Sequence, residues 1–139
     1  MNFVRIVLLL AAVFLAGVAH AQRQPVPIVN HENVAITTSS ATTPAPDAIT
    51  KAIINAAQAR KWTVMHVAGS PKLQAKLFVR NKHTVVVEIE NTATTYSIRY
   101  VSSIDMKYGV EDGVPVIHPF YNRWVSDLME GIRSELIKL

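Results

Sequence analysis

Four consecutive segments in the middle of the chain predict β-strands, and they constrain the fold more than any other feature. They span residues 62–68, 73–80, 84–91 and 95–104, and residues typical of turns separate them. Apolar and polar side chains alternate in the two central segments, which is the pattern of strands with one buried face. Short connections of this kind join antiparallel neighbours. The segments therefore predict a four-stranded antiparallel meander.

The apolar faces of the two central segments also predict how these strands pair. The side chains on these faces are Leu73, Ala75, Leu77 and Val79 in the first segment and Val85, Val87 and Ile89 in the second. Both sets lie on the same side of the sheet if residues 81–83 form a loop that pairs Val79 with Val85. The same register places Lys76 opposite Glu88 on the other face.

An amphipathic helix is predicted on each side of the four strands. Ile49 and Ile53 begin an apolar stripe after Asp47, which is expected to be the N-cap. Near the other end, His118 and Pro119 open a second helix with proline at its first position. We therefore predict an α+β fold, a two-layer sandwich in which an N-terminal and a C-terminal helix pack on one face of the four-stranded antiparallel meander.

The first 21 residues have the features of a secretory signal peptide. Arg5 supplies a positive charge, residues 6–17 are apolar, and Ala19 and Ala21 are small residues at the two specificity positions of a peptidase site. The apolar run of about 12 residues is shorter than the roughly 20 that a transmembrane helix needs. We expect cleavage after Ala21 and a periplasmic mature protein.

Three parts of the chain are therefore predicted: a signal peptide (1–21), a leader or linker rich in Pro, Ser and Thr (22–46), and a single α+β domain (47–139). Within the leader, residues 26–30 are apolar enough to lie along a sheet edge, where proline is tolerated. The sequence contains no cysteine. Because a bacterial lipid anchor is attached through cysteine, we expect no stable membrane anchor.

Charge and spacing argue against several partners and cofactors. The chain has 14 Lys and Arg against 10 Asp and Glu, and no block of like charge. Such a mild excess predicts no nucleic-acid partner. The mature histidines lie far apart without the spacing of metal ligands, and a glycine-rich phosphate loop is absent. We therefore expect no metal site and no cofactor.

The outward face of the predicted sheet is the first candidate for a binding surface. A sheet covered by helices on one face leaves its other face open. Phe78 is a large apolar side chain among charged residues on that face. The residues predicted to bind a partner are Lys76, Phe78, Arg80, Glu88 and Arg99. This surface favours a non-catalytic binding module of the cell envelope whose partner is an envelope protein.

The start of the last helix offers an alternative site formed by His118, Tyr121 and Arg123. A histidine with a tyrosine and an arginine can transfer protons or bind an anion at a helix N-terminus. Such a site would suit a small hydrolase or a ligand-binding protein. No nucleophile accompanies these residues, and capping by His118 and packing of Tyr121 explain them more simply. We therefore name no catalytic residue; whether the protein has an activity, and its oligomeric state, stay open.

Three short segments carry aromatic residues in a distinctive arrangement. They are residues 56–62, residues 96–100 with the pattern Tyr-Ser-Ile-x-Tyr, and residues 117–125 with the pattern Ile-His-x-x-Tyr-Asn-x-Trp. In these segments the chain resembles a group of small exported proteins and lipoproteins of Gram-negative bacteria. The resemblance covers residues 47–139 and supports the α+β fold, but it implies no activity and no functional residue. Without the anchoring cysteine, it implies a location free in the periplasm.

Overall fold

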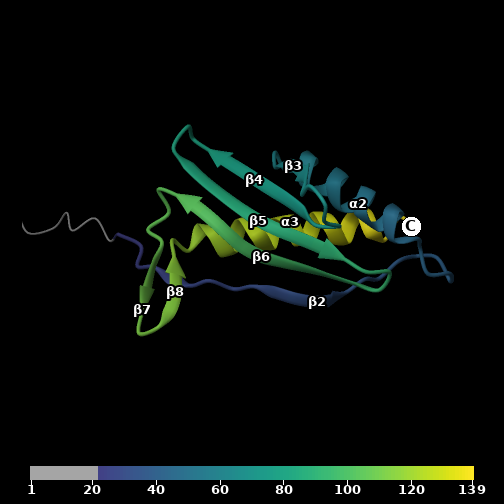
Figure 1. The fold of residues 1–139 in the computed structure, drawn as a ribbon, viewed down its shortest axis with the longest axis horizontal. Coiled ribbons are helices and arrows are strands. Elements are labelled where there is room, and N and C mark those ends of the chain that lie inside the picture. The colour runs from purple at the N-terminus through teal and green to yellow at the C-terminus, as the bar shows by residue number, and fades with distance from the viewer. Residues whose placement is uncertain (1–21) are drawn as a thin grey trace, which may run out of the picture.

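The computed structural model describes residues 22–139, so the predicted signal peptide lies outside the described residues. The described chain is α+β and its two sheets are antiparallel (Figure 1). The helices are α2 (Pro46–Ala59) and α3 (Phe120–Leu136). The strands are β1 (Val26–Pro27), β2 (His31–Ala35), β3 (Thr63–His66), β4 (Leu73–Val79), β5 (His83–Asn91), β6 (Thr95–Ile104), β7 (Gly109–Glu111) and β8 (Val114–Ile117). The predicted α+β class with antiparallel strands is confirmed.

The larger sheet has five strands in the order β2-β6-β5-β4-β3, not the four that were predicted. The additional strand, β2, comes from the segment expected to be a leader or linker and pairs with β6. The same segment contributes β1, which pairs with β8 in a three-stranded sheet of order β1-β8-β7. Strands at a sheet edge form through backbone hydrogen bonds and need little apolar surface. A segment rich in polar residues and proline can therefore still be part of both sheets.

The hairpin of β7 and β8 was not predicted, although the sequence contains a signal for it. Asp112 and Gly113 both have positive φ, 51° and 76°. A two-residue type I′ turn requires this combination, and Asp-Gly is a preferred sequence for it. Glu111 and Val114 flank the turn and pair with each other, and Val110 pairs with Pro115. The Asp-Gly dipeptide, followed by alternating valines at Val114 and Val116, is the signal.

The pairing of β4 with β5 keeps the predicted faces but changes the predicted register. Val79 pairs with His83 and not with Val85. The loop is therefore residues 80–82, one residue earlier than predicted. Because the partner has moved by two residues, every side chain stays on its predicted face.

The local backbone explains this earlier turn. Arg80 and Asn81 both have positive φ, 55° and 52°. The backbone N–H of Lys82 donates to the carbonyl of Val79 at 3.1 Å, which closes the turn. Asparagine tolerates the left-handed region well, whereas arginine does so less often, and the prediction had left Arg80 in the strand.

The helix starts also differ slightly from the prediction. α2 begins at Pro46 with Ala45 as its N-cap, so Asp47 is not the cap. Asp47 lies in the first turn instead, where its carboxylate interacts favourably with the helix dipole. α3 begins one residue after Pro119, which is its N-cap and not its first helical residue. Within residues 22–139, neither helix is long and apolar enough to span a membrane.

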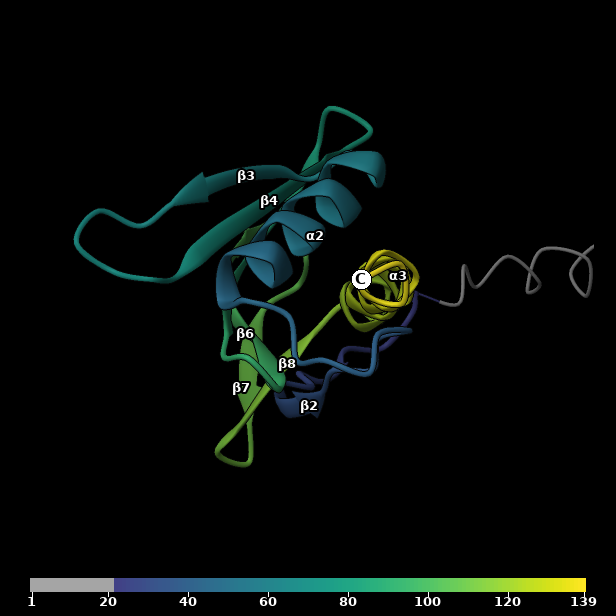
Figure 2. The ribbon, with the colours of Figure 1, turned by 90° about the vertical axis from the view of Figure 1, so that its right-hand side faces the viewer.

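One hydrophobic core contains side chains from both helices and from the five-stranded sheet. Figure 2 shows α2 and α3 next to each other and beside this sheet. The largest fully buried side chains include Ile49, Ile53, Leu73, Ile89, Ile98, Tyr121, Leu128 and Ile132. Burying a side chain such as leucine or isoleucine contributes about 1.5–3 kcal/mol relative to leaving it exposed, so this cluster is the main source of stability. Trp124 is only partly buried and packs against the margin of this core.

Truncation of Leu128 tests this core. Leu128 is fully buried, so Leu128→Ala is expected to lower the free energy of unfolding by about 2–5 kcal/mol. Ile137→Ala is the matched control, because Ile137 is exposed just after the end of α3, and a change within about 0.5 kcal/mol is expected there. Urea denaturation followed by tryptophan fluorescence measures both. Equal effects at the two positions would contradict this placement of α3.

Candidate functional site

The face of the five-stranded sheet opposite the core carries a small apolar patch. Phe78 on β4 is 56% exposed and Ile104 on β6 is 65% exposed. Both pair with Thr84 on β5, so they lie in one row across three strands. The next row pairs Lys76 with Val86. We call Lys76, Phe78, Val86 and Ile104 the open-face patch.

Lys76 is the free charge of the open-face patch. It is exposed, and no carboxylate of residues 22–139 lies within ion-pair distance of it. The predicted contact with Glu88 is absent because the observed register places Gln74 opposite Glu88. Glu88 binds Lys72 instead, at 2.9 Å. Lys76 is therefore available to a carboxylate outside this chain.

Arg99 does not belong to the open-face patch, because it holds the strands together. Two of its nitrogens donate to the two carboxylate oxygens of Glu32, each at 2.7 Å. Its guanidinium also lies 3.2 Å from Glu90 and 3.7 Å from Glu88. The hydrogen bond from Arg99 lowers the pKa of Glu32 below its ordinary value. This network joins β2, β6 and β5, so we assign Glu88 and Arg99 a structural role.

Arg80, the remaining predicted binding residue, lies away from the open face. It lies in the β4–β5 turn and lines a cavity of about 280 Å³ together with Arg123 and Trp124 of α3. Of the five residues predicted to bind a partner, the structure thus brings together only Lys76 and Phe78.

The alternative site is divided among three environments. Arg123 is exposed and lines the cavity just described. The Nδ1 atom of His118, the residue before the N-cap Pro119, accepts a hydrogen bond from the backbone N–H of Phe120 at 3.1 Å. Tyr121 is fully buried, and its hydroxyl has no hydrogen-bond partner in the part of the chain that the structure describes. These three side chains do not converge on one site.

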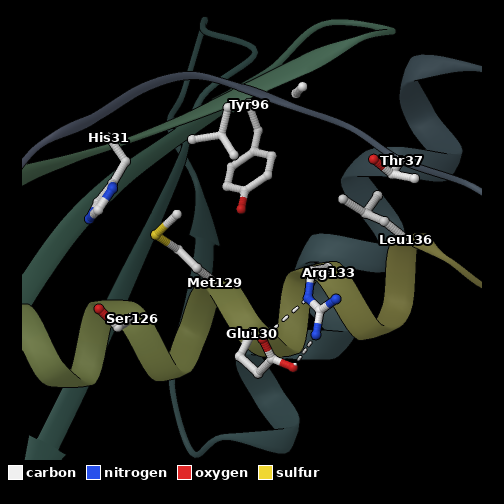
Figure 3. Close-up of a pocket in the computed structure, with 10 residues that line it drawn as sticks. His31, Thr37, Tyr96, Ser126, Met129, Glu130, Arg133 and Leu136 are labelled. Carbon is white, nitrogen blue, oxygen red and sulfur yellow. Dashed lines mark hydrogen bonds and ion pairs between the residues drawn. The ribbon is translucent and has the colours of Figure 1, made fainter.

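A second cavity, of about 340 Å³, lies between β2 and α3 and was missed by sequence reasoning (Figure 3). Its lining residues are His31, Val34, Ala35, Thr37, Tyr96, Ser126, Met129, Glu130, Arg133 and Leu136. One wall is β2, which was expected to be a linker, so the local pattern gave no reason to place His31 near α3. We call this space the β2–α3 cavity.

Among residues 22–139, no group of three or more His, Asp or Glu side chains is arranged to hold a metal ion. Compared with known proteins, the chain matches no protein-family model, no curated protein and no solved structure. The resemblance to small exported proteins therefore stays a prediction, and the candidate sites depend on their geometry alone.

Protonation of His118 is expected to destabilise the start of α3. Burial, followed by the positive charges of Lys107 and Arg23, lowers the pKa of His118 below its ordinary value of 6.5. The folded protein therefore binds fewer protons than the unfolded chain. The stabilisation is present above pH 6.5 and is lost as the pH falls through the folded-state pKa.

The melting temperature, followed by circular dichroism, measures this effect. From about pH 7.5 to about pH 5 it should fall more in the natural protein than in a His118→Asn variant, because asparagine accepts the same hydrogen bond without titrating. The same fall in both proteins would show that another group is responsible.

Proposed function

We propose that the protein is an exported, non-catalytic binding protein of the periplasm that attaches to an envelope protein through the open-face patch. The observation that carries this proposal is the row of Phe78 and Ile104, both more than half exposed, beside Lys76, which has no ion-pair partner among residues 22–139. A two-layer arrangement, with both helices on one face of the strand meander, supports the proposal because it leaves the other face free for a partner.

The chemistry of the patch defines the partner surface. Aromatic and large aliphatic side chains provide most of the binding energy at protein interfaces when a partner excludes water from them. Lys76 adds one positive charge with no carboxylate of its own among the described residues. Complementary charges select the correct partner and orientation. The partner surface is therefore apolar and carries an acidic side chain next to its apolar centre.

The ionic part of the same sheet face supports the choice of the patch. There, Glu32, Glu88 and Glu90 are already paired with Lys72 and Arg99. A partner would gain little from charges that already neutralise each other, and it would first have to displace those contacts. Binding through Phe78 and Ile104 has no such cost.

A double variant tests the patch. Phe78→Ser combined with Ile104→Ser should abolish capture of an envelope protein that the natural mature protein retains on a column, because it removes the apolar surface. Lys76→Glu should weaken the same capture by reversing the charge. Val110→Ser is the matched control, since Val110 is 61% exposed but lies on β7, outside the patch.

Quantitative mass spectrometry of the retained proteins measures the result. The proposal requires one envelope protein that the natural protein and Val110→Ser capture and the double variant does not. Melting curves verify that all variants are folded. Equal capture by the folded double variant, or no protein that depends on the patch, would overturn the proposed surface.

Export is tested separately by the N-terminus of the protein in cells. Cleavage of the predicted signal peptide should yield a mature protein that begins at Gln22 and is released from the periplasm by osmotic shock. Intact-mass analysis of the released protein identifies that terminus. A protein that retains Met1 and stays in the cytoplasm would contradict export without affecting the binding surface.

A further inference from the structure

The β2–α3 cavity has the size and the lining of a small-molecule site. Its volume of about 340 Å³ lies at the lower end of the range of about 300–1,000 Å³ that is usual for such sites. Val34 forms part of one wall, and Met129 and Leu136 of α3 form the opposite wall. In Figure 3 the side chain of Tyr96 extends from β6 toward Met129. The cavity is thus an apolar space with aromatic and thioether surfaces.

Two polar groups face this apolar space without a partner. Tyr96 is only 4% exposed, and within residues 22–139 its hydroxyl makes no hydrogen bond; the same is true of the ring of His31. Burial raises the pKa of Tyr96 and lowers that of His31, so both groups are neutral near pH 7. The hydroxyl of Tyr96 and the ring of His31 both line the cavity. A molecule bound there can therefore form hydrogen bonds with both groups.

The charges at the cavity are already balanced. Glu130 and Arg133 are the charged lining residues, and they bind each other through two hydrogen bonds of 2.7 Å and 3.2 Å. A charged ligand would therefore lose its hydration without gaining a free counter-ion. An uncharged ligand has no such penalty.

The wall formed by β2 is held in place before any ligand binds. Glu32 binds Arg99, and the backbone N–H of Asn33 donates to the hydroxyl of Ser97 at 2.9 Å. A site that is already formed loses less conformational entropy on binding than one that must be ordered. The space between β2 and α3 thus has the pre-organisation of a binding site.

From these observations we propose that the β2–α3 cavity binds an uncharged amphipathic small molecule, whose apolar part packs against Met129 and whose hydroxyl or carbonyl group bonds to Tyr96 and His31. This site is separate from the open-face patch and does not depend on the proposed partner protein. A binding protein with both features would recognise a small molecule and a protein on different surfaces.

The probe for this site is 2-naphthol, an uncharged double ring with one hydroxyl group. Binding is followed by NMR of protein labelled with ¹³C at the methionine methyl groups. We expect the Met129 methyl signal to shift on titration, because an aromatic ring enters its wall of the cavity. Met65 is the internal control, since it is exposed on β3 and lines none of the cavities described. Naphthalene-2-sulfonate, with the same rings and a negative charge, should bind more weakly.

Two variants separate the hydroxyl contact from the space itself. Tyr96→Phe keeps the ring and removes the hydroxyl, so it should weaken 2-naphthol binding about 2- to 10-fold, the range expected for one lost hydrogen bond. Tyr108→Phe removes an exposed hydroxyl outside the cavity and should change nothing. Met129→Trp should fill the space and abolish binding. Because Tyr96→Phe is nearly isosteric, it tests the proposal even if Met129→Trp does not fold.

Three results would overturn the proposal. The first is the absence of a specific Met129 shift up to about 1 mM 2-naphthol, a concentration that detects even weak binding. The second is an affinity of Tyr96→Phe for 2-naphthol equal to that of the natural protein. The third is binding of naphthalene-2-sulfonate as tight as that of 2-naphthol, or tighter. Met129→Trp should still capture the envelope partner, so failure of the cavity and failure of the open-face patch are distinguishable.

Discussion

The contacts of the Arg99 guanidinium connect the edge strand β2 to the two strands next to it in the five-stranded sheet. Arg99 lies on β6 and reaches Glu32 on β2 and Glu90 on β5. A single exposed ion pair contributes little to stability. Here a planar guanidinium meets a carboxylate through two parallel hydrogen bonds, a geometry that adds strength and fixes direction. β2 lies along Tyr96 and forms a wall of the β2–α3 cavity. The contact of Arg99 with Glu32 therefore holds β2 at the sheet edge and, with it, one wall of the cavity.

The outward face of the sheet has a charged end and an apolar end. At one end the charges of β2, β5 and β6 neutralise each other within the protein. At the other end Phe78 and Ile104 are exposed without such compensation. Both ends follow from the same alternation of side chains along the strands, because buried Leu77 and Val85 require their neighbours to face outward. What differs is whether the outward residues find partners inside the chain. The end without partners is the one that can gain free energy by binding another protein.

Sequence reasoning succeeded where the signal was local and failed where it was not. Helical spacing predicted both helices, and strict alternation predicted the two central strands in residues 73–80 and 84–91, because each pattern reports burial of its own segment. β2 makes contacts such as the pair of Glu32 with Arg99, which are 67 residues apart in the chain. The residues near Glu32 in the sequence do not indicate this partner. The open-face patch was found in part, since alternation placed Lys76 and Phe78 outward. Arg80 was misplaced by a turn that begins one residue early, and the β2–α3 cavity was invisible because its wall was expected to be a linker.

A single irregularity in β2 brings the two polar groups of the cavity together. In a regular strand, residues three positions apart point to opposite faces. Yet His31 pairs with Ile98 and Val34 pairs with Tyr96, two residues that share the inward face of β6, because the register shifts between them. The bulge lies between His31 and Val34 and contains Asn33. The φ of Asn33 is 51°, in the left-handed region that asparagine tolerates. Without the shift, either His31 or Val34 would face away from α3. The bulge therefore directs both His31 and Val34 into the cavity that they line.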